Sequence, residues 1–216
     1  MSLPQQGTPP AVPSDAHLRR ARARVLAAGA VLAAGVAACI GLAPRPVDVS
    51  DGLSWFGVTA GTVEVYALTL LLTAGLLGLA ARALNEGTAL RPLREVLLAA
   101  AVLLPVLLAT PYTASTAMNW THMIVGAVLF VLQLAVAGWL WWSRHRTPTA
   151  LALLAVQTLA GVVCFVSVLD LADAMLYGQL VFLAAFLAGV VSALRGELPE
   201  PRTRPQIPPR VRVRHR

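Results

Sequence analysis

The chain has 216 residues, of which 57% are hydrophobic and only 12% are charged, and its mean hydropathy is +0.72. Soluble domains carry about 25% charged residues, so this composition excludes a soluble enzyme, a disordered chain and a fibrous repeat. The formal net charge is +7, all 17 basic residues are arginines, and both cysteines lie inside apolar runs, which excludes a disulfide framework and a thiolate zinc site.

Six apolar segments are long enough to cross a bilayer. A hydrocarbon core about 30 Å thick needs about 20 apolar residues in a helix. The predicted spans are residues 25–43, 63–81, 96–113, 123–142, 149–169 and 175–194, and Pro105 interrupts the third. The apolar–polar alternation of a membrane β-barrel is absent. We therefore expect an all-α fold, a polytopic transmembrane bundle of six helices over residues 25–194.

The two tails lack the apolar content to bury a core. Residues 1–24 are a predicted disordered tail with an arginine-rich end, and residues 195–216 are a predicted disordered Pro/Arg-rich tail. The first span has an alternative interpretation as a cleaved signal sequence, because Val36-Ala37-Ala38-Cys39 loosely resembles a lipoprotein cleavage box. The apolar run continues past Cys39 to Leu42, which favours an uncleaved helix.

Arginines in the short loops predict the orientation. All of them except Arg45 lie before the first span, between spans two and three, between spans four and five, or after the sixth. Basic residues accumulate on the cytoplasmic side of membrane proteins, so both termini are expected in the cytoplasm. The lysine-free composition, rich in alanine and arginine, suggests a bacterium, and we expect a multi-pass protein of the cytoplasmic membrane.

Four ionisable residues fall at the span ends opposite the arginines. Counting about 20 residues from the cytoplasmic arginines gives an external layer of Glu64, His122, Asp170 and Asp173. One histidine with three carboxylates could bind a divalent metal or relay a proton. The alternative is that all four mark water-exposed helix ends, where charge costs little. A single membrane-level histidine cannot ligate haem on both faces, so no cofactor is expected.

Within the predicted spans polar side chains are few. Gln133 and Gln157 fall near the midplane of spans four and five, and we expect them to hydrogen-bond to each other because an unpaired amide in hydrocarbon is costly. The absence of charge at that depth argues against an ion-coupled transporter. Small residues that favour internal packing over a dimer interface are Gly29, Ala33, Gly75, Gly78, Ala185, Gly189 and Ala193.

The C-terminal tail ends in alternating arginines, Arg210, Arg212, Arg214 and Arg216. They could tether the tail to anionic lipid headgroups, at about 1 kcal/mol for each basic residue near a charged leaflet, or they could serve as a topology signal alone. No aromatic residues interleave with them, so nucleic-acid binding is not expected. The expected partners are the lipid bilayer and a membrane protein.

The layout also resembles a known group of proteins. Six short-looped spans, an arginine-rich start, an aspartate-containing segment at residues 47–55 and His122 at the opening of the fourth span resemble small six-helix membrane proteins of actinobacteria. The resemblance covers residues 24–195 and rests on layout, without a diagnostic motif. It implies the six-helix fold and no particular activity or catalytic residue.

These features favour a non-catalytic integral membrane protein that serves as an envelope-associated accessory or interaction subunit. The first alternative is a membrane-embedded enzyme or metal-binding protein that uses the outward-facing His/Asp/Glu layer. The second is a carrier of a small lipid or apolar molecule, which requires a cavity beside Pro105. The lack of a catalytic motif argues against an enzyme, which remains the first alternative.

The predicted orientation is testable by cysteine labelling. With a membrane-impermeant maleimide on intact cells, a cysteine placed at Ser115 should react and one placed at Thr88 should not, because the arginine rule puts only Ser115 outside. The unaltered chain, with Cys39 and Cys164 inside apolar spans, is the control. The reverse pattern would contradict the orientation.

Overall fold

The structure is a computed structural model that describes residues 15–84, 90–143 and 147–195. Its six long helices are α1 (Asp15–Leu42), α2 (Val63–Arg82), α3 (Arg91–Ala109), α4 (Thr116–Ser143), α5 (Pro148–Val168) and α6 (Met175–Ala193). A short 3₁₀ helix, η1 (Leu53–Gly57), lies between α1 and α2. All six long helices are apolar enough to cross a membrane, and no strand occurs in the described ranges. The predicted all-α fold with six membrane-spanning helices is therefore confirmed.

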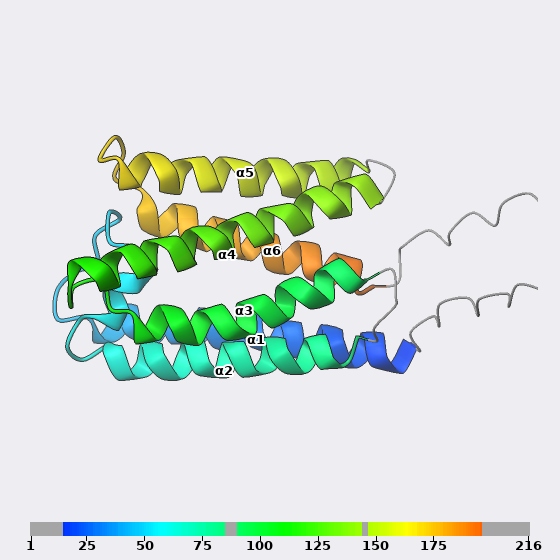
Figure 1. Cartoon of the computed structure of the whole chain (residues 1–216), viewed down its shortest axis with the longest axis horizontal. Coiled ribbons are helices and arrows are strands. Elements are labelled where there is room, and N and C mark those ends of the chain that lie inside the picture. Colours follow the sequence, from blue (N-terminus) through cyan, green and yellow to red (C-terminus); the bar gives the residue numbers. More distant parts are fainter. Residues whose placement is uncertain (1–14, 85–89, 144–146, 196–216) are drawn as a thin grey trace, which may run out of the picture.

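The helices contact one another in a ring that follows the chain. Each helix contacts the next, α6 closes the ring against α1, and α6 also contacts α4. Figure 1 shows successive helices running back and forth along the long axis of the bundle. The start of α1 and the end of α6 therefore lie at the same end. Which side of the membrane this end faces stays a prediction.

Three helices begin well before the predicted spans, and one of them, α3, runs from Arg91 to Ala109 instead of from Val96 to Thr113. Helix α1 starts at Asp15 instead of Val25, because Ala21 and Val25 are fully buried and Leu18 packs against the core. The last part of the predicted disordered tail is thus helical, while residues 1–14 lie outside the described ranges. Helix α4 starts at Thr116 instead of Met123.

Side-chain caps explain where α4 and α5 begin. The Met118 backbone N–H donates to Ser115 Oγ (3.2 Å) just before α4, and the Ala150 N–H donates to Thr147 Oγ1 (3.4 Å) before α5. Side-chain oxygens at this position satisfy N–H groups that lack a partner within the helix.

Helix α3 carries Pro92 in its first turn and runs through Pro105 to Ala109. A proline inside a membrane helix is tolerated because groups of neighbouring helices can satisfy the backbone carbonyl that it leaves unpaired.

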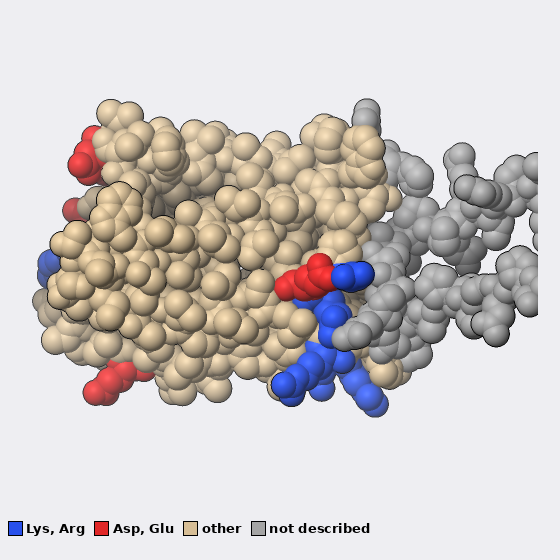
Figure 2. Space-filling model, viewed as in Figure 1, with Lys and Arg blue, Asp and Glu red and all other residues tan. Residues whose placement is uncertain are grey.

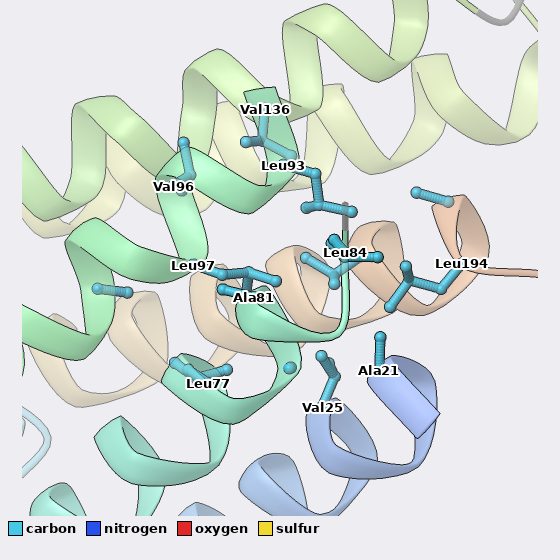
Figure 3. Packing of buried hydrophobic residues seen from close by; sticks show 14 of the residues in the cluster. Ala21, Val25, Leu77, Ala81, Leu84, Leu93, Val96, Leu97, Val136 and Leu194 are labelled. Carbon is cyan, nitrogen blue, oxygen red and sulfur yellow. The ribbon is translucent and has the colours of Figure 1, made fainter. Parts of the chain in front are cut away.

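The main core lies in the half of the bundle nearer the start of α1. Figure 3 shows Val25, Leu77, Leu97 and Leu194 pointing toward one another from α1, α2, α3 and the end of α6. The outward faces carry many exposed large apolar side chains, such as Leu68 at 59% and Phe165 at 64%. In water such a surface would be a large interaction patch, whereas in a bilayer it is the expected contact with lipid.

Charged residues separate to the two ends of the bundle (Figure 2). We call the end that holds the start of α1 the arginine end; its described arginines are Arg19, Arg20, Arg22, Arg24, Arg82, Arg91, Arg94 and Arg195. We call the opposite end the acidic end; its described charged residues are Arg45, Asp48, Asp51, Glu64, Asp170 and Asp173. The arginines of the arginine end come from the segments that the arginine rule assigns to the cytoplasm.

The two glutamines predicted near the midplane are buried, but the predicted bond between them is not formed. Gln133 is 6% exposed and Gln157 is 1% exposed. Gln133 Oε1 and Gln157 Nε2 have no hydrogen-bond partner among the described residues. Gln157 instead lines a cavity of about 10 Å³ between α4, α5 and α6, which is close to the smallest space that holds one water.

Small residues allow the closest helix contacts. A Cβ atom at Gly178 of α6 would lie 2.7 Å from Cys164 Sγ and 3.1 Å from the Ala160 carbonyl oxygen, both on α5. A Cβ atom at Gly35 of α1 would overlap the Thr69 side chain of α2. Among the small residues predicted to pack internally, Ala185, Gly189 and Ala193 of α6 are buried, whereas Ala33 of α1 is exposed.

The α5–α6 contact predicts a specific loss of stability. Gly178→Ala should destabilise the bundle by about 1–3 kcal/mol, the usual range for an overpacked core site, because the new methyl group meets backbone atoms of α5. The matched control is Gly138→Ala in α4, where an added Cβ meets nothing within 4 Å. Thermal unfolding in detergent should show a lower midpoint for Gly178→Ala alone; equal midpoints would contradict the packing.

Candidate functional site at the acidic end

The segment between α1 and α2, residues 43–62, covers part of the acidic end, and we call it the cap segment. Its Leu53 and Phe56 are buried with residues of α1, α2 and α6. The Leu53 N–H donates to Gln179 Oε1 of α6 (2.6 Å), and the Leu176 N–H of α6 donates to the Val49 carbonyl (3.0 Å). Apolar burial and two hydrogen bonds therefore join the cap segment to α6, the neighbour of α1 in the ring.

Within the cap segment, Arg45 is held by local partners. Its Nη2 lies 2.9 Å from Asp51 Oδ1, and its guanidinium carbon lies 4.4 Å from the centre of the Trp55 ring. Asp48 accepts hydrogen bonds from the backbone N–H and the hydroxyl of Ser50 (both 3.0 Å). These bonds from Ser50 lower the pKa of the Asp48 carboxyl below its ordinary value. The described arginine of this end is thus engaged on the surface of the cap segment.

His122 is the polar centre of the acidic end. It lies in the second turn of α4, is half-buried, and contacts two other elements. Its Nδ1 is 2.9 Å from the Thr110 carbonyl oxygen at the end of α3, and its Nε2 is 2.7 Å from Ser54 Oγ in η1. The Tyr112 ring packs at a centroid distance of 5.7 Å.

The partners of His122 define which ring nitrogen carries the proton. A carbonyl oxygen can only accept a hydrogen bond, so Nδ1 is the protonated nitrogen that donates to Thr110. In the neutral imidazole Nε2 is then an acceptor, and the Ser54 hydroxyl donates to it. In this arrangement the lone pair of His122 Nε2 points at the Ser54 hydroxyl group.

A small cavity adjoins this pair. It has a volume of about 20 Å³ and is lined by Ser54, Tyr66, Tyr112 and His122, with apolar walls that include Leu107 and Leu108. A space of this size holds about one water molecule. Side chains from η1, α2, α4 and the α3–α4 turn therefore line one water-sized cavity.

The four residues predicted as a metal layer all lie at the acidic end, but they do not form a metal-ligand group. Glu64 is exposed in the first turn of α2, Asp170 is exposed just after α5, and Asp173 is exposed just before α6. Across residues 15–84, 90–143 and 147–195, no three His, Cys, Asp or Glu side chains come together as a possible metal site. The structure joins His122 to Ser54 and Thr110 instead.

Ser54 was not predicted from the sequence, because only ionisable residues were assigned to the site. Ser54 is neutral, lies between two spans and is 68 residues from His122 in the chain, so neither spacing nor composition connects the two. Its place just after Gly52-Leu53, in a short polar and aromatic segment, was the available signal. The predicted lipid-binding residues Arg210, Arg212, Arg214 and Arg216 lie outside the described residues.

No protein-family model, curated protein or solved structure matches the chain. The resemblance to six-helix actinobacterial proteins accordingly stays a prediction from layout, and the candidate site must be judged by its own geometry.

The metal hypothesis has a direct measurement. Because the described neighbours of His122 are a hydroxyl and a carbonyl, we expect purified protein to contain less than one equivalent of any divalent metal by elemental analysis. The His122→Ala variant should give the same low value. Stoichiometric metal in the wild type that is lost in His122→Ala would contradict this geometry and restore the predicted layer of Glu64, His122, Asp170 and Asp173.

Proposed function

We propose that this integral membrane protein is an accessory or interaction subunit of the cytoplasmic membrane and works chiefly by packing against another membrane protein. The observation that carries the proposal is one face of α1. Along this helix, small residues follow one another on a surface that none of the other helices covers: Ala30, Ala33, Ala34, Ala37, Ala38 and Gly41 are all exposed.

These residues share one side of the helix. At 100° per residue, positions 30, 33, 34, 37, 38 and 41 fall within an arc of about 140°. A Cβ atom added at Gly41 would meet nothing within 4 Å, so this side is open at its end. Small residues let the backbone of a second helix approach closely and gain van der Waals contact in lipid.

Other exposed faces differ from this one. The outward side of α5 carries Leu151, Leu159 and Phe165, with Leu159 66% exposed, which is the large apolar surface expected against acyl chains. The contrast supports a protein partner on α1 and lipid on α5. We therefore take α1 as the partner-binding helix.

The proposal favours an interaction subunit over a carrier of small apolar molecules. A carrier requires a cavity that encloses its passenger, and ligand pockets are usually about 300–1,000 Å³. The cavities beside Gln157 and His122 have volumes of about 10 and 20 Å³. The second of these, near the end of α3, is lined by Leu107 and Leu108 but not by Pro105.

The orientation and the lipid contacts belong to the same proposal. With the arginine end in the cytoplasm, the guanidinium groups of α1, α2 and α3 lie at the level of anionic headgroups, where each adds about 1 kcal/mol of attraction. Arg24 Nη1 also donates to the Leu79 carbonyl of α2 (2.6 Å), so this arginine links two helices as well. The arginines of the C-terminal tail extend the same charge.

The proposal predicts site-specific crosslinking in the membrane. A photoreactive benzoylphenylalanine at Ala34 should give, in intact cells, one discrete adduct whose second chain is identified by mass spectrometry. The matched control is the same probe at Ala155, an exposed position of α5, where lipid is expected. A second variant carries the probe at Ala38 and the substitution Ala34→Leu. Its adduct should be lost, because the larger side chain prevents the close approach of a second helix. No adduct at Ala34, or equal adducts at Ala34 and Ala155, would contradict the proposal.

A further inference from the structure

The contact between Ser54 and His122 has the geometry of a serine nucleophile and its base. Such pairs are recognised by a hydroxyl within hydrogen-bond reach of a base that a third group orients. Here the hydroxyl oxygen is 2.7 Å from His122 Nε2, and the Thr110 carbonyl holds Nδ1 at 2.9 Å. Each of the three groups comes from a different element, η1, α4 and the end of α3.

We propose that Ser54 is a nucleophile activated by His122 and that it accepts an acyl group from carboxylic esters at the membrane interface. This inference goes beyond the proposed function, because it concerns the chemistry of the cap segment and not the partner of α1.

The location of the pair selects the substrate class. Ser54 lies at the acidic end, where the helices stop and the hydrocarbon core gives way to the headgroup region. Ester groups of membrane lipids occupy that level. The adjoining cavity of about 20 Å³ is large enough for a carbonyl oxygen or one water, and its leucine walls favour an apolar acyl chain whose remainder stays in the surrounding lipid.

The reaction proceeds in two balanced steps. Ser54 Oγ attacks the carbonyl carbon and gives its proton to His122 Nε2; the C–O bond of the ester then breaks, and the leaving alkoxide takes that proton from His122 as the alcohol departs. Water then attacks the acyl-serine, with His122 taking and returning one proton. The products are an alcohol and a carboxylic acid, and no oxidant or reductant is consumed.

Tyr112 supplies a hydrogen-bond donor at the same cavity. It lies in the turn between α3 and α4 and lines the cavity with Ser54 and His122. Burial, with the nearby charge of Asp51, raises the pKa of its hydroxyl above the ordinary value, so the group stays protonated. A neutral phenol hydroxyl is the kind of donor that can stabilise the oxyanion formed during acyl transfer.

The test is active-site labelling of the full chain in nanodiscs. An alkyl fluorophosphonate should phosphonylate Ser54 in the wild type, as located by peptide mass spectrometry. His122→Ala should lower the labelling rate by about 100-fold or more, the usual contribution of a general base, and Ser54→Ala should remove the adduct. The matched control is Ser50→Ala, a serine of the same cap segment whose hydroxyl bonds Asp48; it should label at the wild-type rate.

Folding is checked separately for each variant. Thermal unfolding in the same nanodiscs identifies variants that keep the wild-type midpoint, and a soluble serine hydrolase added to the sample confirms that the probe is active. Ser54 unlabelled in folded wild type, or labelled at the same rate in folded His122→Ala, would overturn the inference. Should both variants unfold, the wild-type adduct decides: Ser54 modified before heating supports the inference, and Ser54 modified only after heating overturns it.

Discussion

The bilayer requires every backbone amide in its core to be paired, and the rest of the structure depends on this constraint. Lipid offers no hydrogen-bond partner, so each span closes its own amides in a helix. Six such helices have to change direction at the two membrane surfaces, and the charged residues therefore gather at the arginine end and the acidic end. Between the ends, packing depends on small residues, as at Gly178 against Cys164.

The cap segment shows how an irregular stretch is fixed where water becomes available. Its backbone is not closed in one long helix, so it takes hydrogen-bond partners from other elements. The Gln179 side chain of α6 accepts one bond from it, its Val49 carbonyl accepts a second from the start of α6, and its Ser54 hydroxyl bonds His122. The buried Phe56 adds apolar area. The same contacts that hold the segment down bring a hydroxyl, an imidazole and a phenol to one water-sized cavity.

How much of this was predictable depends on the kind of signal. Hydropathy identified all six spans, since a length of about 20 apolar residues is an absolute requirement of the membrane, and the arginines correctly grouped the loops. The early start of α1 was missed because alternating alanine and arginine resembles a polar tail until Ala21 and Val25 are seen buried in the main core. The Gln133–Gln157 bond failed because depth fixes the level of a residue but not the direction in which its side chain points. Likewise, Ser54 and His122 meet through tertiary packing. Their contact belongs to no sequence motif, so the sequence does not predict it.

The two proposed properties of the protein lie next to each other in the chain. The exposed small-residue face of α1 ends at Gly41, and the cap segment begins at Ala43. A helix packed along that face would reach the membrane surface beside Arg45 and its partners Asp51 and Trp55. Trp55 and Ser54 are neighbours in η1, so the residue that stacks on Arg45 and the candidate nucleophile belong to the same short helix. The surface proposed to bind a partner and the serine proposed to react therefore lie on consecutive segments of the chain, α1 and η1, although they occupy different surfaces of the bundle.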